Sequence, residues 1–367
     1  MKILHCHSTF SLGGKEARAV RLMNAFGNAA QHTILTAAPG ALGARDAIDT
    51  DVQVDFPCDA PLLTGKPSPT RYRRLTTYMK QFDLVLSYNW GSMDAVGARR
   101  LFPRGCPPLI HHEDGFNQDE SETLNWKRSL FRRLMFPSAK HVIVPSQRLE
   151  TIVRDVWKYR AVVRIPNGID VAAYTASPAP DAIPGFVRGD GDVIIGTLAG
   201  LRAVKNVPRL VRAVAGLPPH CRLVIVGEGP EKGAIAAEAD RLGISDRVFL
   251  AGFLPSPHRY IGLFDIFALS SDSEQFPISL IEAMAAGVAA VSTDVGDVRQ
   301  ILPPAARAFV VPVADEAGYH AALAKLAGDM TLRKALGRAN RALAAGSYDE
   351  AAMIARYAAL YGIGGHA

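Results

Sequence analysis

Two glutamates, Glu274 and Glu282, stand in the segment S-S-D-S-E-Q-F-P-I-S-L-I-E-A-M-A-A-G, residues 270–287. A carboxylate can accept two hydrogen bonds from neighbouring hydroxyls, so a pair of carboxylates suits a polyol. The free N–H groups at a helix start suit a phosphate. A ligand with ribose and hexose hydroxyls flanking a diphosphate would satisfy all of these groups. We therefore interpret the segment as a nucleotide-sugar site; the alternative is a pair of solvated glutamates.

The same segment predicts the elements that position these carboxylates. An apolar run at residues 265–269 predicts a buried strand, and a polar loop carrying Glu274 follows it. A helix then begins near Pro277 and ends near Gly287. Glu274 is therefore expected at the carboxyl end of a parallel strand and Glu282 about a turn and a half inside the helix, facing one crevice. The donor-binding candidates at the helix start are Phe276, Pro277, Ile278 and Ser279.

This segment resembles the E-x7-E signature of the family-four retaining glycosyltransferases. The chain keeps both glutamates, and it departs from the usual pattern at Gln275, where glycine is common, and at Ala289, where proline is common. The resemblance implies that Glu274 orients the hydroxyls of the donor sugar and that Glu282 holds the ribose. The other shared positions are Phe276, Ala283, Met284, Ala285 and Gly287.

Two glycine-containing turns also resemble segments of this family. Residues 11–16, S-L-G-G-K-E, match a G-G-x-E loop, in which Gly13 and Gly14 would let an anion approach the backbone. In the same loop, Lys15 and Glu16 are candidates on the acceptor side. The turn G-E-G-P at residues 227–230 resembles the family's V-G-x-G-P turn, so Gly229 is expected beside the nucleotide base.

The resemblance further implies a pair of cations for the leaving diphosphate. Many members have G-R-L-x-x-x-K; this chain has Gly200 at the arginine position, Arg202 two residues later, and Lys205 at the lysine position. A guanidinium and an ammonium can offset the charge that builds on a leaving diphosphate. We expect Lys205 to take this role and Arg202 to replace the missing arginine.

A histidine pair follows an apolar run in L-I-H-H-E-D-G, residues 109–115. This resembles the position of the family's acceptor-side histidine. His111 is the closer match because it directly follows the predicted strand; His112 is its rival, and Glu113 is a further acceptor-side candidate. The expected catalytic set is His111, Glu274, Arg202 and Lys205.

The length of 367 residues predicts two domains, because one core usually supports roughly 150 to 200 residues. Short apolar stretches alternate with helical or polar segments in both halves, which predicts two open α/β units. The resemblance implies the GT-B architecture, two Rossmann-like, doubly wound parallel-sheet domains that face a cleft. The expected boundaries are 1–165 for the acceptor-side domain, 166–185 for a Pro- and Ala-rich linker, 186–346 for the nucleotide-sugar domain and 347–367 for a closing helix that returns to the first domain.

Composition argues against several classes of protein. No run of about 18 apolar residues is present, and the first ten residues have no long apolar segment, so neither a transmembrane helix nor a secretory signal is predicted. The four cysteines lie far apart, which fits reduced thiols and argues against disulfides and metal sites. We expect a cytoplasmic protein.

The positive charge is concentrated in the first half. Residues 1–170 hold 23 Lys and Arg against 16 Asp and Glu, whereas the remainder holds 18 against 19. This excess predicts an anionic acceptor or peripheral contact with an anionic membrane, at the inner face of the cell membrane. Residues 71–80 are the preferred contact, because Tyr72, Leu75, Tyr78 and Met79 interleave apolar groups with Arg71, Arg73, Arg74 and Lys80. No nucleic-acid-binding motif accompanies the basic clusters, so nucleic acid is not an expected partner.

The resemblance implies transfer with retention, in which the acceptor attacks from the front face and the leaving diphosphate helps to remove its proton. The expected acceptor is a lipid-linked or envelope or exopolysaccharide glycan. No Asp-x-Asp motif lies near these elements, so no metal and no other cofactor is required, and a UDP-sugar is the expected co-substrate. The alternatives are a non-hydrolysing sugar-nucleotide epimerase, a non-catalytic sugar-nucleotide-binding protein, and a transferase that acts on a soluble sugar phosphate.

Overall fold

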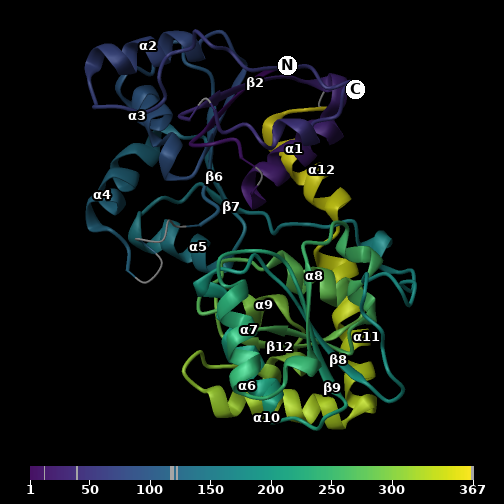
Figure 1. Ribbon diagram of the computed structural model, residues 1–367. Coiled ribbons are helices and arrows are strands. Elements are labelled where there is room, and N and C mark those ends of the chain that lie inside the picture. The colour runs from purple at the N-terminus through teal and green to yellow at the C-terminus, as the bar shows by residue number, and fades with distance from the viewer. Residues whose placement is uncertain (12, 39, 116–119, 121–122, 365–367) are drawn as a thin grey trace. The chain divides into compact units, whose positions relative to one another are not determined.

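The structure is a computed structural model, and it describes residues 1–11, 13–38, 40–115, 120 and 123–364. These residues form two compact units, one made of residues 1–167 together with those from 352 onward, the other of residues 168–351. Each unit contains one fully parallel sheet flanked by helices (Figure 1). The prediction of two α/β units with parallel sheets is therefore confirmed.

The first unit has a seven-stranded sheet in the order β3-β2-β1-β4-β5-β6-β7. Its strands are β1 (Lys2–His7), β2 (Gln31–Thr36), β3 (Val54–Asp55), β4 (Leu84–Tyr88), β5 (Leu109–His112), β6 (His141–Val144) and β7 (Val162–Arg164). Its helices are α1 (Gly14–Phe26), α2 (Pro69–Met79), α3 (Met93–Leu101), α4 (Trp126–Met135), α5 (Gln147–Thr151) and most of α12 (Glu350–Tyr361).

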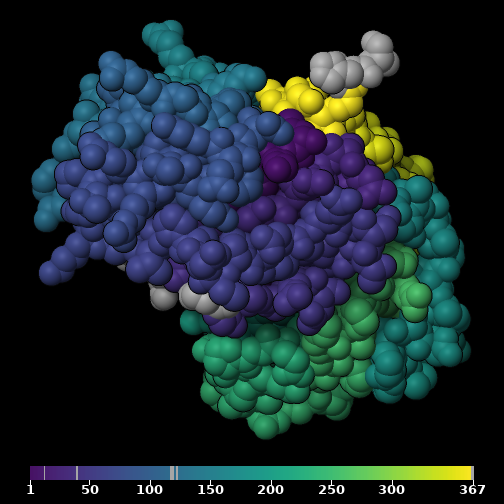
Figure 2. Space-filling model, turned by 90° about the horizontal axis from the view of Figure 1, so that it is seen from above, coloured from purple at the N-terminus to yellow at the C-terminus, as the bar shows by residue number. Residues whose placement is uncertain are grey.

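Alternation along the strands divides the core of the first unit between the two faces of its sheet. Leu4 of β1 packs in the cluster that includes residues of α2 and α3, while the adjacent Ile3 packs with α1 and α12. Helix α12 (yellow) lies beside α1 (purple) in Figure 1, and in Figure 2 the yellow C-terminal atoms adjoin the purple N-terminal ones. Tyr357 and Tyr361 of α12 are buried there. The C-terminal segment from residue 352 to 364 is thus part of the first unit.

The second unit has a six-stranded sheet in the order β10-β9-β8-β11-β12-β13. Its strands are β8 (Val193–Leu198), β9 (Cys221–Val226), β10 (Val248–Gly252), β11 (Ile266–Leu269), β12 (Ala289–Thr293) and β13 (Val310–Val311). Its helices are α6 (Val207–Ala215), α7 (Lys232–Arg241), α8 (Ile278–Ala285), α9 (Val298–Ile301), α10 (Glu316–Gly328) and α11 (Met330–Ser347). In both units the strand order reverses beside the first strand, as in Rossmann folds.

The segment expected as a linker belongs to the second unit from residue 168 onward. Val171, Tyr174 and Ile183 are buried in the hydrophobic core of that unit. Its proline- and alanine-rich composition therefore belongs to an irregular but ordered segment. Among the described residues, no helix combines the length and the apolar character needed to cross a membrane.

Candidate functional site

A cavity of about 390 Å³ lies at the carboxyl ends of β8 and β9 in the second unit. The chain forms its walls from the segment after β8, the segment after β9, residues 253–260 and helix α8. The sheet order reverses between β8 and β11, and open α/β sheets bind ligands at such switch points. Its lining residues are Leu198, Ala199, Gly200, Val226, Gly227, Glu228, Phe253, Leu254, Pro257, Tyr260 and Glu282.

Glu282 is the carboxylate that helix α8 contributes to this cavity. The hydroxyl of Tyr174 donates a hydrogen bond of 2.9 Å to its Oε1 atom. Burial, and then the negative charge of Glu282, raise the pKa of Tyr260, whose hydroxyl donates to the Leu254 carbonyl at 3.2 Å. A carboxylate held in this way can accept hydrogen bonds from ligand hydroxyls.

Close backbone packing forms the wall between β8 and β9. Gly227 has a φ of +144°, and a Cβ atom there would lie 1.8 Å from the carbonyl oxygen of Ala199. A Cβ atom at Gly229 would lie 2.3 Å from the carbonyl oxygen of Leu201. Gly229 thus holds this turn against residues 199–201, and it is not among the residues that line the cavity.

Glu274 and Lys205 form an ion pair between the loops that follow β11 and β8. Lys205 Nζ lies 2.5 Å from Glu274 Oε1, and the Ser271 hydroxyl donates to the same oxygen at 2.7 Å. The Ser270 hydroxyl donates to the Lys205 carbonyl at 3.0 Å, so backbone and side chains both join the two loops. Arg202 lies exposed just before the short helical turn that carries Lys205.

Helix α8 begins directly after the loop that carries Glu274, as predicted. Pro277 is its N-cap residue, while Ile278 and Ser279, half-buried, form its first turn. Phe276 packs against the core of the second unit and meets the Tyr348 ring edge-on at 6.0 Å. Gly296 supports the loop from behind, because a Cβ atom there would lie 2.5 Å from the Glu274 carbonyl oxygen.

The predicted glycine loop of the first unit leads into α1. Gly13 is the N-cap residue and Gly14 the first helical residue; Leu12 lies outside the described residues. Lys15 forms an ion pair of 2.8 Å with Glu16, which is buried, and donates to the Ser8 hydroxyl at 3.3 Å. The loop therefore presents a cation whose charge is already balanced.

His111 lies inside β5 rather than directly after it, which corrects the predicted end of the strand. Its ring is fully buried, with Nδ1 2.8 Å from the Ser87 hydroxyl and Nε2 3.6 Å from Glu113 Oε2. Glu113 is buried as well, and it accepts a 3.1 Å hydrogen bond from Arg132. The geometry thus assigns Glu113 a structural ion pair with Arg132.

His112 is buried in an aromatic stack of the first unit. Its Nδ1 atom donates to the Ser87 carbonyl at 3.3 Å, since a carbonyl can only accept, and its Nε2 atom therefore accepts from the Tyr361 hydroxyl at 2.7 Å. Burial, followed by the charge of Arg18, holds the pKa of His112 well below its ordinary value. Its bond to Tyr361 ties helix α12 to β5.

Several residues that shape the site were not predicted from the sequence. Tyr174 lay in the stretch interpreted as a linker, and Phe253 and Tyr260 lay beyond an edge strand without a motif. Phe253 directly follows β10, and its side chain is 73% exposed at the cavity. An aromatic ring at such a place can stack on a planar base.

The two units match two families in turn. Residues 3–173 match the family described as Glycosyltransferase Family 4, and residues 182–343 match Glycosyl transferases group 1. Both are families of glycosyltransferases, and the chain has the two Rossmann-like units of the GT-B fold. Anabaena HepE, solved in complex with UDP, has a TM-score of 0.80 at 19% identity and covers 98% of this chain and 99% of its own.

Two curated relatives resemble part of the chain. N-acetyl-alpha-D-glucosaminyl L-malate synthase of Bacillus anthracis is 26% identical over 197 residues, which are 53% of this chain and 52% of that protein. Phosphatidyl-myo-inositol mannosyltransferase of Mycolicibacterium smegmatis is 33% identical over 192 residues, which are 48% and 47%. The chain spans about half the length of these relatives.

Proposed function

We propose that this protein is a retaining glycosyltransferase that moves a sugar from a nucleoside-diphosphate sugar to an acceptor. The observation that carries the proposal is the cavity at the switch point of the second sheet, which Glu282 lines. The segments that follow β8 and β11 also carry the ion pair of Lys205 with Glu274. Glu282 would hold the ribose, Phe253 would stack on the base, and the start of α8 would bind the diphosphate.

In the proposed reaction, the bond between the sugar C1 and the diphosphate oxygen breaks. A bond from C1 to the acceptor oxygen forms on the same face, and the acceptor proton passes to the diphosphate. Lys205 and Arg202 would offset the charge that grows on the diphosphate, and Glu274 would orient sugar hydroxyls and the Lys205 ammonium together. We also propose that the reaction requires no metal ion. Acceptor-side roles are proposed for Lys15, Glu16, His111 and His112.

We propose a UDP-sugar as the donor and a lipid-linked or other envelope glycan as the acceptor, at the cytoplasmic face of a membrane. HepE, with UDP bound in its structure, and the mycobacterial relative named for phosphatidyl-myo-inositol support this choice. The Bacillus anthracis relative is named for L-malate, which keeps a soluble acceptor as the second candidate.

The test is a thermal-shift screen of UDP, GDP and ADP, followed by transfer assays with the matching sugar nucleotides. We expect UDP to raise the unfolding temperature most, and the product to keep the anomeric configuration of the donor, as measured by NMR. An inverted product would overturn the retaining course. Isomerisation of the donor without any acceptor would favour an epimerase, and binding without turnover across many acceptors would favour a non-catalytic protein.

A further inference from the structure

Helix α4 exposes a continuous apolar stripe on the first unit. Trp126, Leu130 and Leu134 follow one another at four-residue spacing, so they share one side of the helix. Their exposed fractions are 69%, 48% and 53%. Arg132, in contrast, is fully buried between the rings of Trp90 and Trp157. The orientation of α4 is therefore fixed by its buried side, and the large apolar residues face outward.

Cations border this stripe. Lys127 and Arg133 are exposed on its two sides, and the ten residues of α4 include no Asp or Glu. The Lys127 ammonium lies 5.7 Å from the centre of the Trp126 ring. An amphipathic helix with Trp and Leu beside basic residues has the composition of helices that lie in the interface of an anionic bilayer.

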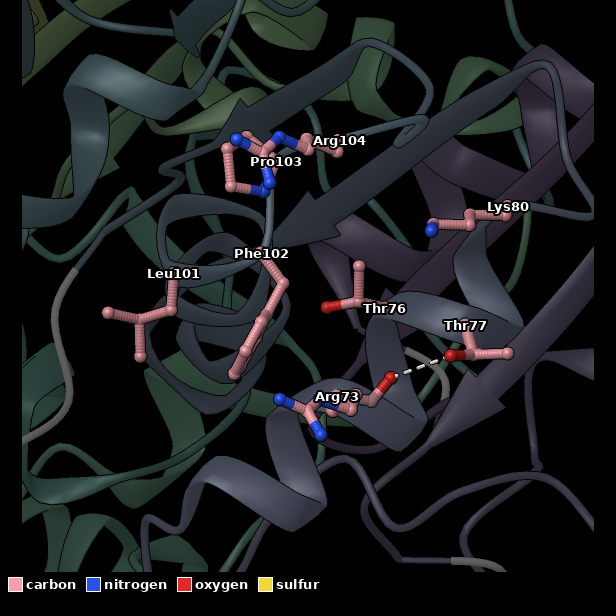
Figure 3. A pocket seen from close by; sticks show the side chains of 8 residues that line it. All are labelled: Arg73, Thr76, Thr77, Lys80, Leu101, Phe102, Pro103 and Arg104. Atoms are coloured by element: carbon pink, nitrogen blue, oxygen red, sulfur yellow. Dashed lines mark hydrogen bonds between the residues drawn. The ribbon is translucent and has the colours of Figure 1, made fainter.

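A basic pocket continues this surface between α2 and α3. The cavity has a volume of about 580 Å³, and no acidic residue is among the eight that line it. In Figure 3 the side chains of Arg73, Lys80 and Arg104 lie around it, with Leu101 and Phe102 at one side. The Arg73 guanidinium stacks over the Phe102 ring at 5.4 Å. Within the described part of the chain, these three cations form no ion pair.

The pocket and the stripe adjoin each other. Leu101 lines the pocket and is 55% exposed, and the neighbouring Arg100 donates a hydrogen bond of 3.3 Å to the Leu134 carbonyl of α4. Figure 1 shows α2, α3 and α4 on one side of the first unit, and α3 contacts both of the others. We call this set of residues the α2–α4 surface: Arg73, Lys80, Leu101, Arg104, Trp126, Lys127, Leu130, Arg133 and Leu134.

We infer that the α2–α4 surface binds an anionic phospholipid bilayer. Trp126, Leu130 and Leu134 enter the boundary between headgroups and acyl chains, and the pocket cations bind lipid phosphates. Charge complementarity favours this occupant, because the exposed cations Lys127 and Arg133 border the apolar stripe and suit an anionic surface. This inference rests on the proposed function in one respect: an acceptor in the membrane gives the enzyme a reason to bind there.

The structure also corrects the contact predicted from the sequence. In residues 71–80, Tyr72, Leu75 and Met79 are buried and belong to the core of the first unit. Arg71 is held by Asp94 at 2.7 Å and by backbone carbonyls of residues 63–66. The exposed side of α2 carries Arg73 and Arg74, and Tyr78 is half-buried, so most of the apolar part of the membrane contact comes from α4.

The test is sedimentation of the full chain with phosphatidylcholine vesicles, with and without phosphatidylglycerol, at low and high salt. We expect binding only to the anionic vesicles, and weaker binding at high salt. Leu130→Ser with Leu134→Ser, and separately Arg73→Glu with Lys80→Glu, should each lower the affinity by about tenfold or more. The matched controls in the second unit, Val187→Ser with Met330→Ser and Lys334→Glu with Arg338→Glu, change exposed residues and should bind as the unaltered protein does.

Three outcomes would overturn the inference: no binding of the unaltered protein to anionic vesicles, full binding by either pair of surface variants, or equal losses in the controls. A change from dimer to monomer in Leu130→Ser with Leu134→Ser, without vesicle binding, would instead assign the surface to a second copy of the chain. UDP affinity, measured in solution on the same variants, separates the two proposals. Vesicle binding without UDP binding would contradict the proposed function but would still support membrane binding by the α2–α4 surface.

Discussion

Glu282 lines the cavity of the second unit, and its proposed partner there is the ribose of the nucleotide. Because ribose hydroxyls would donate to its negative charge, Glu282→Gln should weaken UDP binding by roughly 1.5 to 3 kcal/mol, the range for hydrogen bonds to charged groups. Isothermal titration calorimetry with UDP gives the measurement. Tyr174→Phe is the matched control, since it removes only the hydroxyl that holds Glu282 and should have a smaller effect. Unchanged UDP affinity in a folded Glu282→Gln variant would contradict the ribose assignment.

The proposed role of Arg202 and Lys205 in the transition state can be distinguished experimentally from a role in donor binding. Charge on the diphosphate grows as the glycosidic bond breaks, so Arg202→Ala and Lys205→Ala should each lower kcat more than they weaken donor binding. Steady-state kinetics together with UDP titrations measure the two effects. Lys334→Ala, an exposed lysine of α11, is the control and should change neither. Intact turnover in Arg202→Ala would show that Arg202 does not replace the missing motif arginine.

At the scale of elements, the strand, loop and helix that carry the two glutamates were predictable. The expected strand at 265–269 is β11 at Ile266–Leu269, and the helix between Pro277 and Gly287 is α8 at Ile278–Ala285. Local signals are strong here: an apolar run marks the strand, Pro277 marks the start of the helix and Gly287 marks its end. The burial of Tyr72, Leu75 and Met79 was also within reach, since their spacing places them on one side of a helix.

Contacts between distant segments could not be predicted in the same way. Tyr174 meets Glu282 across 108 residues of sequence, and Lys205 meets Glu274 across 69. Such pairs exist only after the sheet has assembled, and no local pattern specifies them. The family resemblance assigned both partners of the second pair to the ligand, whereas the structure joins them to each other.

Because the loops after β8 and β9 are in close contact, adding a single methyl group at Gly227 should lower the stability of the second unit. Gly227→Ala would place Cβ against the Ala199 carbonyl and would also impose a positive φ on alanine, so it should destabilise the second unit by about 2 kcal/mol or more and weaken UDP binding. Urea unfolding followed by circular dichroism measures the change. Gly233→Ala in α7, where a Cβ atom meets nothing within 4 Å, should be neutral or stabilising. Equal behaviour of the two variants would show that the close approach has no energetic consequence.

At the scale of the whole molecule, the two units differ in their buried titratable groups. Among the described histidines, the buried ones all lie in the first unit: His5, His7, His32, His111 and His112. Burial is the main cause that lowers the pKa of His5, His7 and His112 well below the ordinary value. It also lowers the pKa of His32 to about 4. The second unit contains three described histidines, none of them buried.

This asymmetry predicts that acid unfolds the first unit before the second. Burial makes the pKa of such a histidine lower in the folded state than its value of about 6.5 in the unfolded state. Above pH 6.5 its contribution to stability is therefore fully present, and this contribution is lost as the pH falls toward 4. For His32 alone the loss at pH 5 is about 2 kcal/mol. All three tryptophans, Trp90, Trp126 and Trp157, lie in the first unit, so tryptophan fluorescence follows that unit while far-ultraviolet circular dichroism follows both. Urea titrations at pH 7.5 and pH 5 give one unfolding midpoint from fluorescence, for the first unit, and a later one from circular dichroism, for the second unit. Between pH 7.5 and pH 5 the urea concentration at the fluorescence midpoint should fall more than that at the later midpoint. His32→Gln should reduce the fall of the fluorescence midpoint. Fluorescence and circular-dichroism midpoints that move together with pH would contradict the assignment of acid sensitivity to the first unit.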